Sequence, residues 1–265
     1  MLRTRVLSAV ILGPIVLYLV YLGGAWVLFL VTLLCLLALR ELFEMAEGLG
    51  FNAGRISGYV AGLIVILSAY FAQGRYLPFL FVVWLLFCLA TSVIRYPDQS
   101  IGDTSFNYLA VSYVAVLFAH LVLLRSLEQG LYLTFLTLAV TWATDTGAYF
   151  AGRAFGRHSL APRVSPHKTI EGSIGGLLAA AGIGALIGYW VPNQTLSPMV
   201  LAGFGLVAGI TGQLGDLVES ALKRFAGVKD SGQIIPGHGG ILDRFDSFLF
   251  TVPTVYYLFI GLIIS

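Results

Sequence analysis

The stretch that decides the fold runs from Asp216 to Asp246 and reads DLVESALKRFAGVKDSGQIIPGHGGILDRFD. It combines five carboxylates with four Lys or Arg and one His, in a chain that is 58% hydrophobic and 11% charged. An apolar chain gathers both signs of charge only where a polar ligand or a water-filled site stabilises them. We therefore expect the apolar remainder to form membrane helices around a polar site.

The composition of all 265 residues indicates an all-α, polytopic transmembrane protein, because the mean hydropathy is +0.90. Apolar runs long enough to cross a bilayer of about 30 Å recur from end to end, without a soluble domain between them. We predict one integral membrane domain over 1–265, with N-terminal helices in 1–130 and the catalytic helices in 131–265. The nine predicted transmembrane spans are 6–22, 26–39, 56–72, 77–94, 107–124, 131–152, 172–191, 198–219 and 247–264.

Two segments outside these spans have a recognisable character. Residues 40–49, RELFEMAEGL, are amphipathic and should continue the second span as a helix lying at the membrane interface. Residues 95–106, RYPDQSIGDTSF, should form a turn-rich loop, because Pro97 and Gly102 interrupt a helix.

The distribution of Lys and Arg predicts the orientation of the chain. With a cytoplasmic N-terminus, thirteen of the fifteen basic residues face the cytoplasm and only Arg75 and Arg125 lie on the other side. This asymmetry favours an odd number of spans in the inner membrane, with the polar loops 153–171 and 220–246 in the cytoplasm. The thirteen are Arg3, Arg5, Arg40, Arg55, Arg95, Arg153, Arg157, Arg163, Lys168, Lys223, Arg224, Lys229 and Arg244.

Carboxylates interrupt two of the predicted spans, the sixth at Asp145 and the eighth at Asp216, and a further acidic pair lies at the start of the ninth. Asp145 either bonds a neighbouring helix, through Thr141 or Thr144, or faces a polar site. Asp216 and Glu219 share a helical face, as do Asp243 and Asp246, and adjacent like charges repel unless a cation or a proton neutralises them. Oxygen ligands without Cys or paired His favour one or two Mg²⁺ ions, although a cation or proton relay would use similar residues.

Basic and glycine-rich segments accompany the acidic pairs. Lys223, Arg224, Lys229 and Arg244 interleave with the carboxylates, which suits a phosphate-rich substrate, although each alone could be ordinary flanking charge. The turn PGHGG at 236–240 allows backbone N–H groups to approach an anion closely. Within it, His238 could contact phosphate, transfer a proton or serve as a structural hydrogen-bonding residue.

Residues 165–172, SPHKTIEG, form a second polar turn, which leads into a helix N-terminus and could bind an anion.

Residues 220–246 resemble the signature of the phosphatidate cytidylyltransferases (CDP-diacylglycerol synthases), as SALKR, KD, G and PGHGGILDRFD follow one another at the family's spacing. Residues 165–172 resemble the second polar loop of the same family. The resemblance is strongest over about 140–250, whereas the earlier spans agree in hydrophobic character and number only.

The resemblance implies a reaction in which CTP and phosphatidate give CDP-diacylglycerol and pyrophosphate. It also implies dependence on Mg²⁺, a homodimer in the bilayer and no nucleic-acid partner. For the metal, the resemblance implies ligation by Asp216 and Asp243, with Asp246 and Glu219 nearby. For the substrates, it implies phosphate contacts from Ser220, Lys223, Arg224, Lys229 and His238, with Arg244 also in contact with substrate. Nucleotide binding is implied for Ser165, Lys168 and Thr169. Asp216, Lys223, Arg224, Asp243 and His238 form the implied catalytic set.

Two other functions would also use part of this pattern. A cation-coupled transporter would explain Asp145 and Asp216, but the sequence contains no convincing internal duplication. A different CTP-dependent lipid enzyme, such as a polyprenol kinase, is disfavoured by the match over 220–246. We therefore expect a cytidylyltransferase, in which the phosphate monoester attacks the α-phosphorus of CTP without an activated serine, and catalysis depends on alignment and charge neutralisation.

Overall fold

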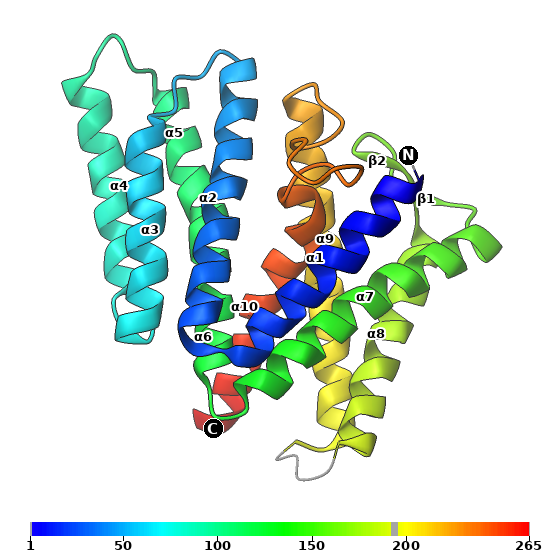
Figure 1. Cartoon of the computed structure of the whole chain (residues 1–265). Coiled ribbons are helices and arrows are strands. Elements are labelled where there is room, and N and C mark those ends of the chain that lie inside the picture. Colours follow the sequence, from blue (N-terminus) through cyan, green and yellow to red (C-terminus); the bar gives the residue numbers. More distant parts are fainter. Residues whose placement is uncertain (1, 192–195, 265) are drawn as a thin grey trace. The chain divides into compact units, whose positions relative to one another are not determined.

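The computed structural model describes residues 2–191 and 196–264, and the side chains in those ranges except those of 2–7, 9 and 264. The side chains of Arg3 and Arg5, which enter the predicted charge asymmetry, lie outside the described part. Within it, α5, η1 and α6 follow one another without a break, so the chain forms nine continuous helices, one at each predicted span (Figure 1). The elements are α1 (Leu2–Leu22), α2 (Gly24–Gly48), α3 (Arg55–Ala72), α4 (Leu77–Ile94), α5 (Ile101–Ala110), the π-helix η1 (Val111–Val116), α6 (Leu117–Ser126), α7 (Gly130–Phe155), β1 (Ser159–Ala161), β2 (Ser165–Thr169), α8 (Ile170–Trp190), α9 (Pro198–Phe225) and α10 (Leu242–Ile264).

Seven helices of the described chain are long and apolar enough to cross a membrane. They are α2, α3, α4, the continuous α5–α6 helix, α8, α9 and α10. α1 contributes a shorter apolar helix, Val10–Leu22, and α7, which carries Asp145, is not among the seven. The predicted all-α membrane fold is confirmed, and the count of nine spans stays a prediction.

The prediction of a loop over residues 95–106 is wrong in its second half. α5 begins at Ile101, and Gly102 lies inside it. Ser100 caps the helix through a capping box: its hydroxyl accepts a bond from the Asp103 N–H (3.1 Å), and the Asp103 carboxylate accepts one from the Ser100 N–H (2.6 Å). Two satisfied backbone donors outweigh the low helix propensity of one glycine in the first turn.

The polar loops are shorter than predicted, because helices extend into both. α9 continues to Phe225 and α10 begins at Leu242, so only residues 226–241 connect them. In the other loop, β1 and β2 form an antiparallel hairpin that pairs Ser159 with Thr169 and Ala161 with Ser165. This hairpin, which the sequence did not predict, leads directly into α8.

The chain divides into two compact units, and each is described by itself. The first contains the residues up to Glu128 together with Phe225–Arg244, and the second contains Gln129–Arg224 and the residues from Phe245. The connection between α9 and α10 therefore packs with the N-terminal helices, although the sequence places it among the C-terminal ones.

In the first unit, α2 packs against α3 and the continuous α5–α6 helix, and it continues from its apolar span through Gly48 as predicted. Leu39, Phe43 and Ile66 are fully buried where α2 packs against α3. At the other end of the unit, Arg125 donates to the carbonyls of Val20 (2.8 Å) and Tyr21 (3.0 Å). These carbonyls lie in the last turn of α1 and lack helical partners, so the guanidinium caps that helix with the favourable charge.

In the second unit, α7 and α8 lie side by side (Figure 1), and α9 packs against the small residues of α8. A Cβ at Gly205 of α9 would overlap the carbonyl oxygen of Ala180 in α8. Close backbone approach of this kind is typical of helix pairs in membranes, where van der Waals packing replaces the hydrophobic effect.

Replacing Gly205 with Ala should therefore push α8 and α9 apart and lower the unfolding free energy by about 1–3 kcal/mol, the usual cost of overpacking. Gly203 of the same helix is the matched control, because a Cβ there meets nothing within 4 Å. Thermal unfolding of both purified Ala variants in detergent measures the effect. Equal melting temperatures would contradict the proposed close contact.

Candidate active site

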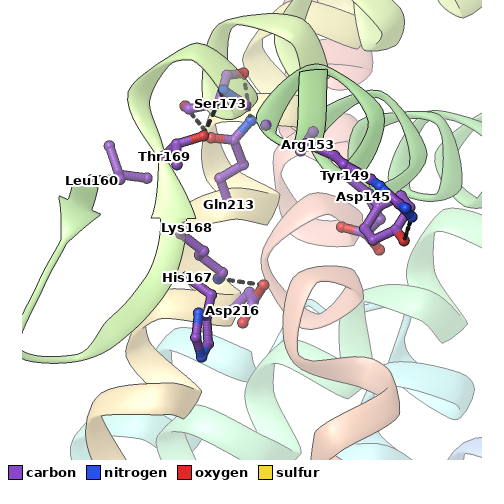
Figure 2. Close-up of a pocket in the computed structure, with 13 residues that line it drawn as sticks. Asp145, Tyr149, Arg153, Leu160, His167, Lys168, Thr169, Ser173, Gln213 and Asp216 are labelled. Carbon is purple, nitrogen blue, oxygen red and sulfur yellow. Dashed lines mark hydrogen bonds and ion pairs between the residues drawn. The ribbon is translucent and has the colours of Figure 1, made fainter. Parts of the chain in front are cut away.

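A pocket of about 640 Å³ opens in the second unit. Three helices and both strands of the hairpin line it: α7 contributes Asp145 and Arg153, β1 contributes Leu160, β2 contributes Lys168, α8 contributes Ser173, and α9 contributes Asp216. Figure 2 shows Lys168 and Asp216 pointing toward each other, with Asp145 on the facing helix. The pocket thus combines cations and carboxylates from segments that are far apart in the sequence.

Lys168 and Asp216 form an ion pair within this pocket. Their side chains are 28% and 29% exposed, although Nζ of Lys168 itself is buried against Asp216. The Ser220 hydroxyl, one turn along α9, lies 3.4 Å from Oδ1 of Asp216. The structure therefore brings together three of the residues assigned to metal, nucleotide and phosphate binding.

Local structure fixes the position of Lys168. Thr169, the next residue, caps α8 by accepting a hydrogen bond from the Gly172 N–H (3.1 Å). Glu171, in the first turn of α8, accepts bonds from the N–H groups of Arg157 (3.1 Å) and His158 (3.3 Å). β2 and the start of α8 thus hold each other, and Lys168 is presented from their junction.

The other predicted residues of this region have distinct environments. Arg224 donates to the carbonyl of Val164 in the hairpin (3.3 Å), so it braces the turn between β1 and β2. Ser165 begins β2 and does not line the pocket. Glu219 is 1% exposed and forms an ion pair with Lys223 (2.7 Å).

The two adjacent carboxylates of α9 are thus each accompanied by a lysine, Asp216 by Lys168 and Glu219 by Lys223. Among the described residues, no group of three His, Cys, Asp or Glu side chains lies close enough to hold a metal ion by itself. The metal ligation assigned to Asp216, Asp243, Asp246 and Glu219 stays a prediction.

The environment of Asp145 favours one of its two interpretations. The hydroxyls of Thr141 and Thr144 donate to the carbonyls of Thr137 (2.9 Å) and Val140 (2.8 Å) in their own helix. Asp145 lines the pocket instead of being held by these threonines. It therefore belongs with the polar site.

Gln213 and Ser173 are pocket residues that the sequence did not single out. The Gln213 amide donates to the Ser173 carbonyl (3.0 Å), and the Ser173 hydroxyl donates to the amide oxygen of Gln213. This two-way contact fixes α8 against α9 one turn before Asp216. The sequence could have indicated Gln213, because its amide interrupts an otherwise apolar stretch of small residues.

The first unit contains the glycine-rich loop. There, Oδ2 of Asp243 accepts hydrogen bonds from the backbone N–H of Ser231 (2.9 Å), the Ser231 hydroxyl (3.0 Å) and the backbone N–H of Gly240 (2.8 Å). Asp243 thus closes residues 231–243 into one structure at the start of α10.

Glu41 of α2 is a second carboxylate bound by the same loop. It is fully buried and accepts hydrogen bonds from the N–H groups of Ile241 (2.6 Å) and Leu242 (2.9 Å) and from the Ser231 hydroxyl (2.9 Å). The sequence shows only a glutamate in an amphipathic helix, so it could not indicate this role.

The Glu41 carboxylate leaves no room for a side chain at two positions of the loop, which explains why both are glycines. A Cβ at Gly232 would lie 2.9 Å from Oε1 of Glu41, and one at Gly240 would lie 2.5 Å from Oε2. The loop was predicted to bring backbone N–H groups close to an anion. In the structure, the Gly240 N–H binds the Asp243 carboxylate, and the N–H groups of Ile241 and Leu242, just after the turn, bind that of Glu41.

The remaining predicted residues lie within this loop or in the first turns of α10. His238 is contacted at Nδ1 by the Ser8 hydroxyl of α1 (2.8 Å), and its carbonyl accepts a bond from Nε of Arg244 (2.9 Å). Lys229 is exposed. Asp246 lies one turn beyond Asp243 on α10 but belongs to the second unit, where it accepts a bond from the Ser247 N–H (2.6 Å).

Comparison with known proteins assigns the family. The family model of the cytidylyltransferases matches residues 3–261. The phosphatidate cytidylyltransferase of Staphylococcus aureus (strain COL) is 38% identical over 267 residues, which cover 97% of this chain and 99% of that protein. The phosphatidate cytidylyltransferase of Bacillus subtilis (strain 168) is 37% identical over 268 residues, covering 97% of both chains. Matches over nearly the full length, together with a pocket lined by paired cations and carboxylates, show that the chain belongs to the cytidylyltransferase family.

Proposed function

We propose that the chain catalyses the transfer of a cytidylyl group from CTP to phosphatidate, giving CDP-diacylglycerol and pyrophosphate. The observation that carries this proposal is the pocket of the second unit, where Lys168 and Asp216 meet in a member of the cytidylyltransferase family. An ammonium group suits the phosphates of CTP, and a carboxylate would suit a metal ion that neutralises their charge.

The proposed chemistry requires no activated nucleophile from the protein. An oxygen of the phosphatidate phosphate attacks the α-phosphorus of CTP, and the bond to the pyrophosphate oxygen breaks in line with it. Lys168 neutralises charge that develops on the phosphates, and Thr169 fixes the backbone from which Lys168 extends. Ser220 orients the Asp216 carboxylate.

The carboxylates of the pocket fit Mg²⁺. Asp145 and Asp216 offer hard oxygen atoms, and Mg²⁺ is commonly held by one or two carboxylates together with substrate phosphates. The ion would be held by Asp216, with Asp145, Glu219, Asp243 and Asp246 as the other candidates. When bound, it would neutralise phosphate charge and help to orient the two substrates.

We further propose a homodimer in the inner membrane with nine spans, a cytoplasmic N-terminus and an active site at the cytoplasmic face. The excess of Lys and Arg on one side, thirteen against two, supports this orientation. The location also suits the substrates, because an anionic lipid headgroup meets water-soluble CTP at that surface.

The test is an assay with CTP labelled either in its α-phosphate or in its γ-phosphate. With purified protein, phosphatidate and Mg²⁺, we expect the α-label to enter chloroform-extractable lipid and the γ-label to leave as pyrophosphate. Omitting phosphatidate or chelating the metal should abolish lipid labelling. Lipid that takes up the γ-label would indicate a kinase instead. No lipid label from a folded protein would contradict the proposal and make ion-flux measurements the next step.

A further inference from the structure

Glu41 occupies an unusual position for a glutamate in an apolar helix. Its side chain is 0% exposed, although its neighbours on α2, Arg40 and Glu44, form an ion pair at the surface (2.7 Å). A buried carboxylate is costly unless hydrogen bonds satisfy it. Glu41 therefore occupies this position only because donors from another part of the chain surround it.

Those donors all belong to one short segment, the glycine-rich loop. Oε1 accepts the bond from the Ile241 N–H, and Oε2 accepts those from the Leu242 N–H and the Ser231 hydroxyl. Leu242 is the first residue of α10 and Ile241 immediately precedes it, so the carboxylate also lies at the positive end of that helix. Three hydrogen-bond donors thus converge on one buried carboxyl group, so this contact holds the loop on α2.

The Ser231 hydroxyl connects Glu41 with Asp243. Its oxygen lies 2.9 Å from Oε2 of Glu41 and 3.0 Å from Oδ2 of Asp243. The Asp243 N–H also approaches this oxygen (3.4 Å). The hydroxyl carries one proton, which is shared between the two carboxylates within reach of its oxygen, and a shift of the loop on α2 would move the Asp243 carboxylate with it.

We propose that Glu41 is a positioning residue, which sets the place of the Asp243 carboxylate by clamping residues 231–242 onto α2. This inference rests on the proposed cytidylyl transfer, because the position of Asp243 matters for turnover only if Asp243 takes part in it. Glu41 itself contacts backbone and Ser231, so its effect on the reaction is transmitted through the loop.

The decisive variant is Glu41→Gln. An amide of the same shape keeps one acceptor oxygen and turns an NH₂ group toward the remaining donors, so part of the clamp is replaced by repulsion. Glu44→Gln is the matched control, because it makes the same substitution one turn along the same helix at an exposed carboxylate. Both are compared with wild type by amide hydrogen exchange and by steady-state kinetics.

We expect Glu41→Gln to raise the exchange rate of the Ile241 and Leu242 amides at least tenfold while the exchange of α8 stays unchanged. Its kcat should fall by about 10–100-fold, the usual cost of losing a group that orients a ligand residue, and KM for CTP should stay close to wild type. Glu44→Gln should match wild type in both measurements. Unchanged exchange in Glu41→Gln would overturn the clamp, and faster exchange with unchanged kcat would overturn the positioning role.

A second variant keeps the proposal testable if Glu41→Gln does not fold. Ser231→Ala removes the hydroxyl between the carboxylates and keeps both backbone bonds to Glu41. It should lower kcat without speeding exchange at Ile241 and Leu242, and a wild-type kcat would overturn the connection to Asp243. An inactive wild-type protein would count against the proposed function, whereas the exchange measurement would still decide whether the clamp exists.

Discussion

Asp216→Asn should remain folded and lose activity by about 10³-fold, the upper range for removing one electrostatic partner of a phosphoryl-type transition state. The amide has the shape of the carboxylate and can still accept the bond from Ser220. It lacks the negative charge that faces Lys168 and that would bind a metal ion. Transfer of the α-label from CTP to lipid measures the loss, and thermal unfolding shows whether the fold is kept.

Asp98→Asn is the matched control, because it makes the same substitution at an exposed residue outside the pocket. It should have the activity of wild type. Wild-type turnover in Asp216→Asn would remove Asp216 from the catalytic machinery.

The double variant Lys168→Met/Asp216→Asn separates a structural ion pair from two groups that act on substrate. If the pair only stabilised the pocket, removing both partners would be milder than removing one, since no uncompensated charge is left. We expect the opposite. The double variant should be at least as inactive as either single one, because Lys168 and Asp216 act on different parts of the reactants.

Asp243→Asn should abolish turnover while the protein stays folded. The amide oxygen of Asn can take the place of Oδ2 and accept the bonds from Ser231 and Gly240, so the loop should keep its structure. The charge is lost, and we expect a fall in kcat comparable to that of Asp216→Asn, about 10³-fold. Hydrogen exchange over 231–243 should stay at the wild-type rate.

Asp243→Ala provides the contrast that isolates the charge. It removes the acceptor as well, so it should be equally inactive but should also speed hydrogen exchange in the loop. Asp230→Asn, at an exposed position of the same loop, is the control that should behave as wild type. If Asp243→Asn were fully active, Asp243 would be a structural residue of the loop only.

The sequence predicted the helices well because membrane helices are specified by local composition. Every continuous helix of the described chain overlaps a predicted span, since about 20 apolar residues have no other stable arrangement in a bilayer. The error at 95–106 had a local cause. Pro97 and Gly102 indicate a turn. Ser100 and Asp103 have the S-x-x-D spacing of a capping box, which starts a helix instead.

The parts of the site that could not be predicted depend on contacts between distant residues. Lys168 and Asp216 were singled out by type, but their pairing depends on how the β1–β2 hairpin meets α9. The role of Glu41 was even less predictable from the sequence. Its partners are two backbone N–H groups and one serine, about 190–200 residues away. Nearly every residue type has a backbone N–H group, so an amino-acid pattern cannot identify these donors.

The same separation in sequence has a consequence for biosynthesis. Ile241 follows Glu41 by 200 residues, so at about 5–20 residues per second the ribosome needs about 10–40 s to supply the partner of a helix already made. During that interval, the donors that will surround the Glu41 carboxylate do not yet exist. Helix α2 therefore waits for a segment made about 200 residues later, and the first unit is completed only after residues 231–242 have been synthesised.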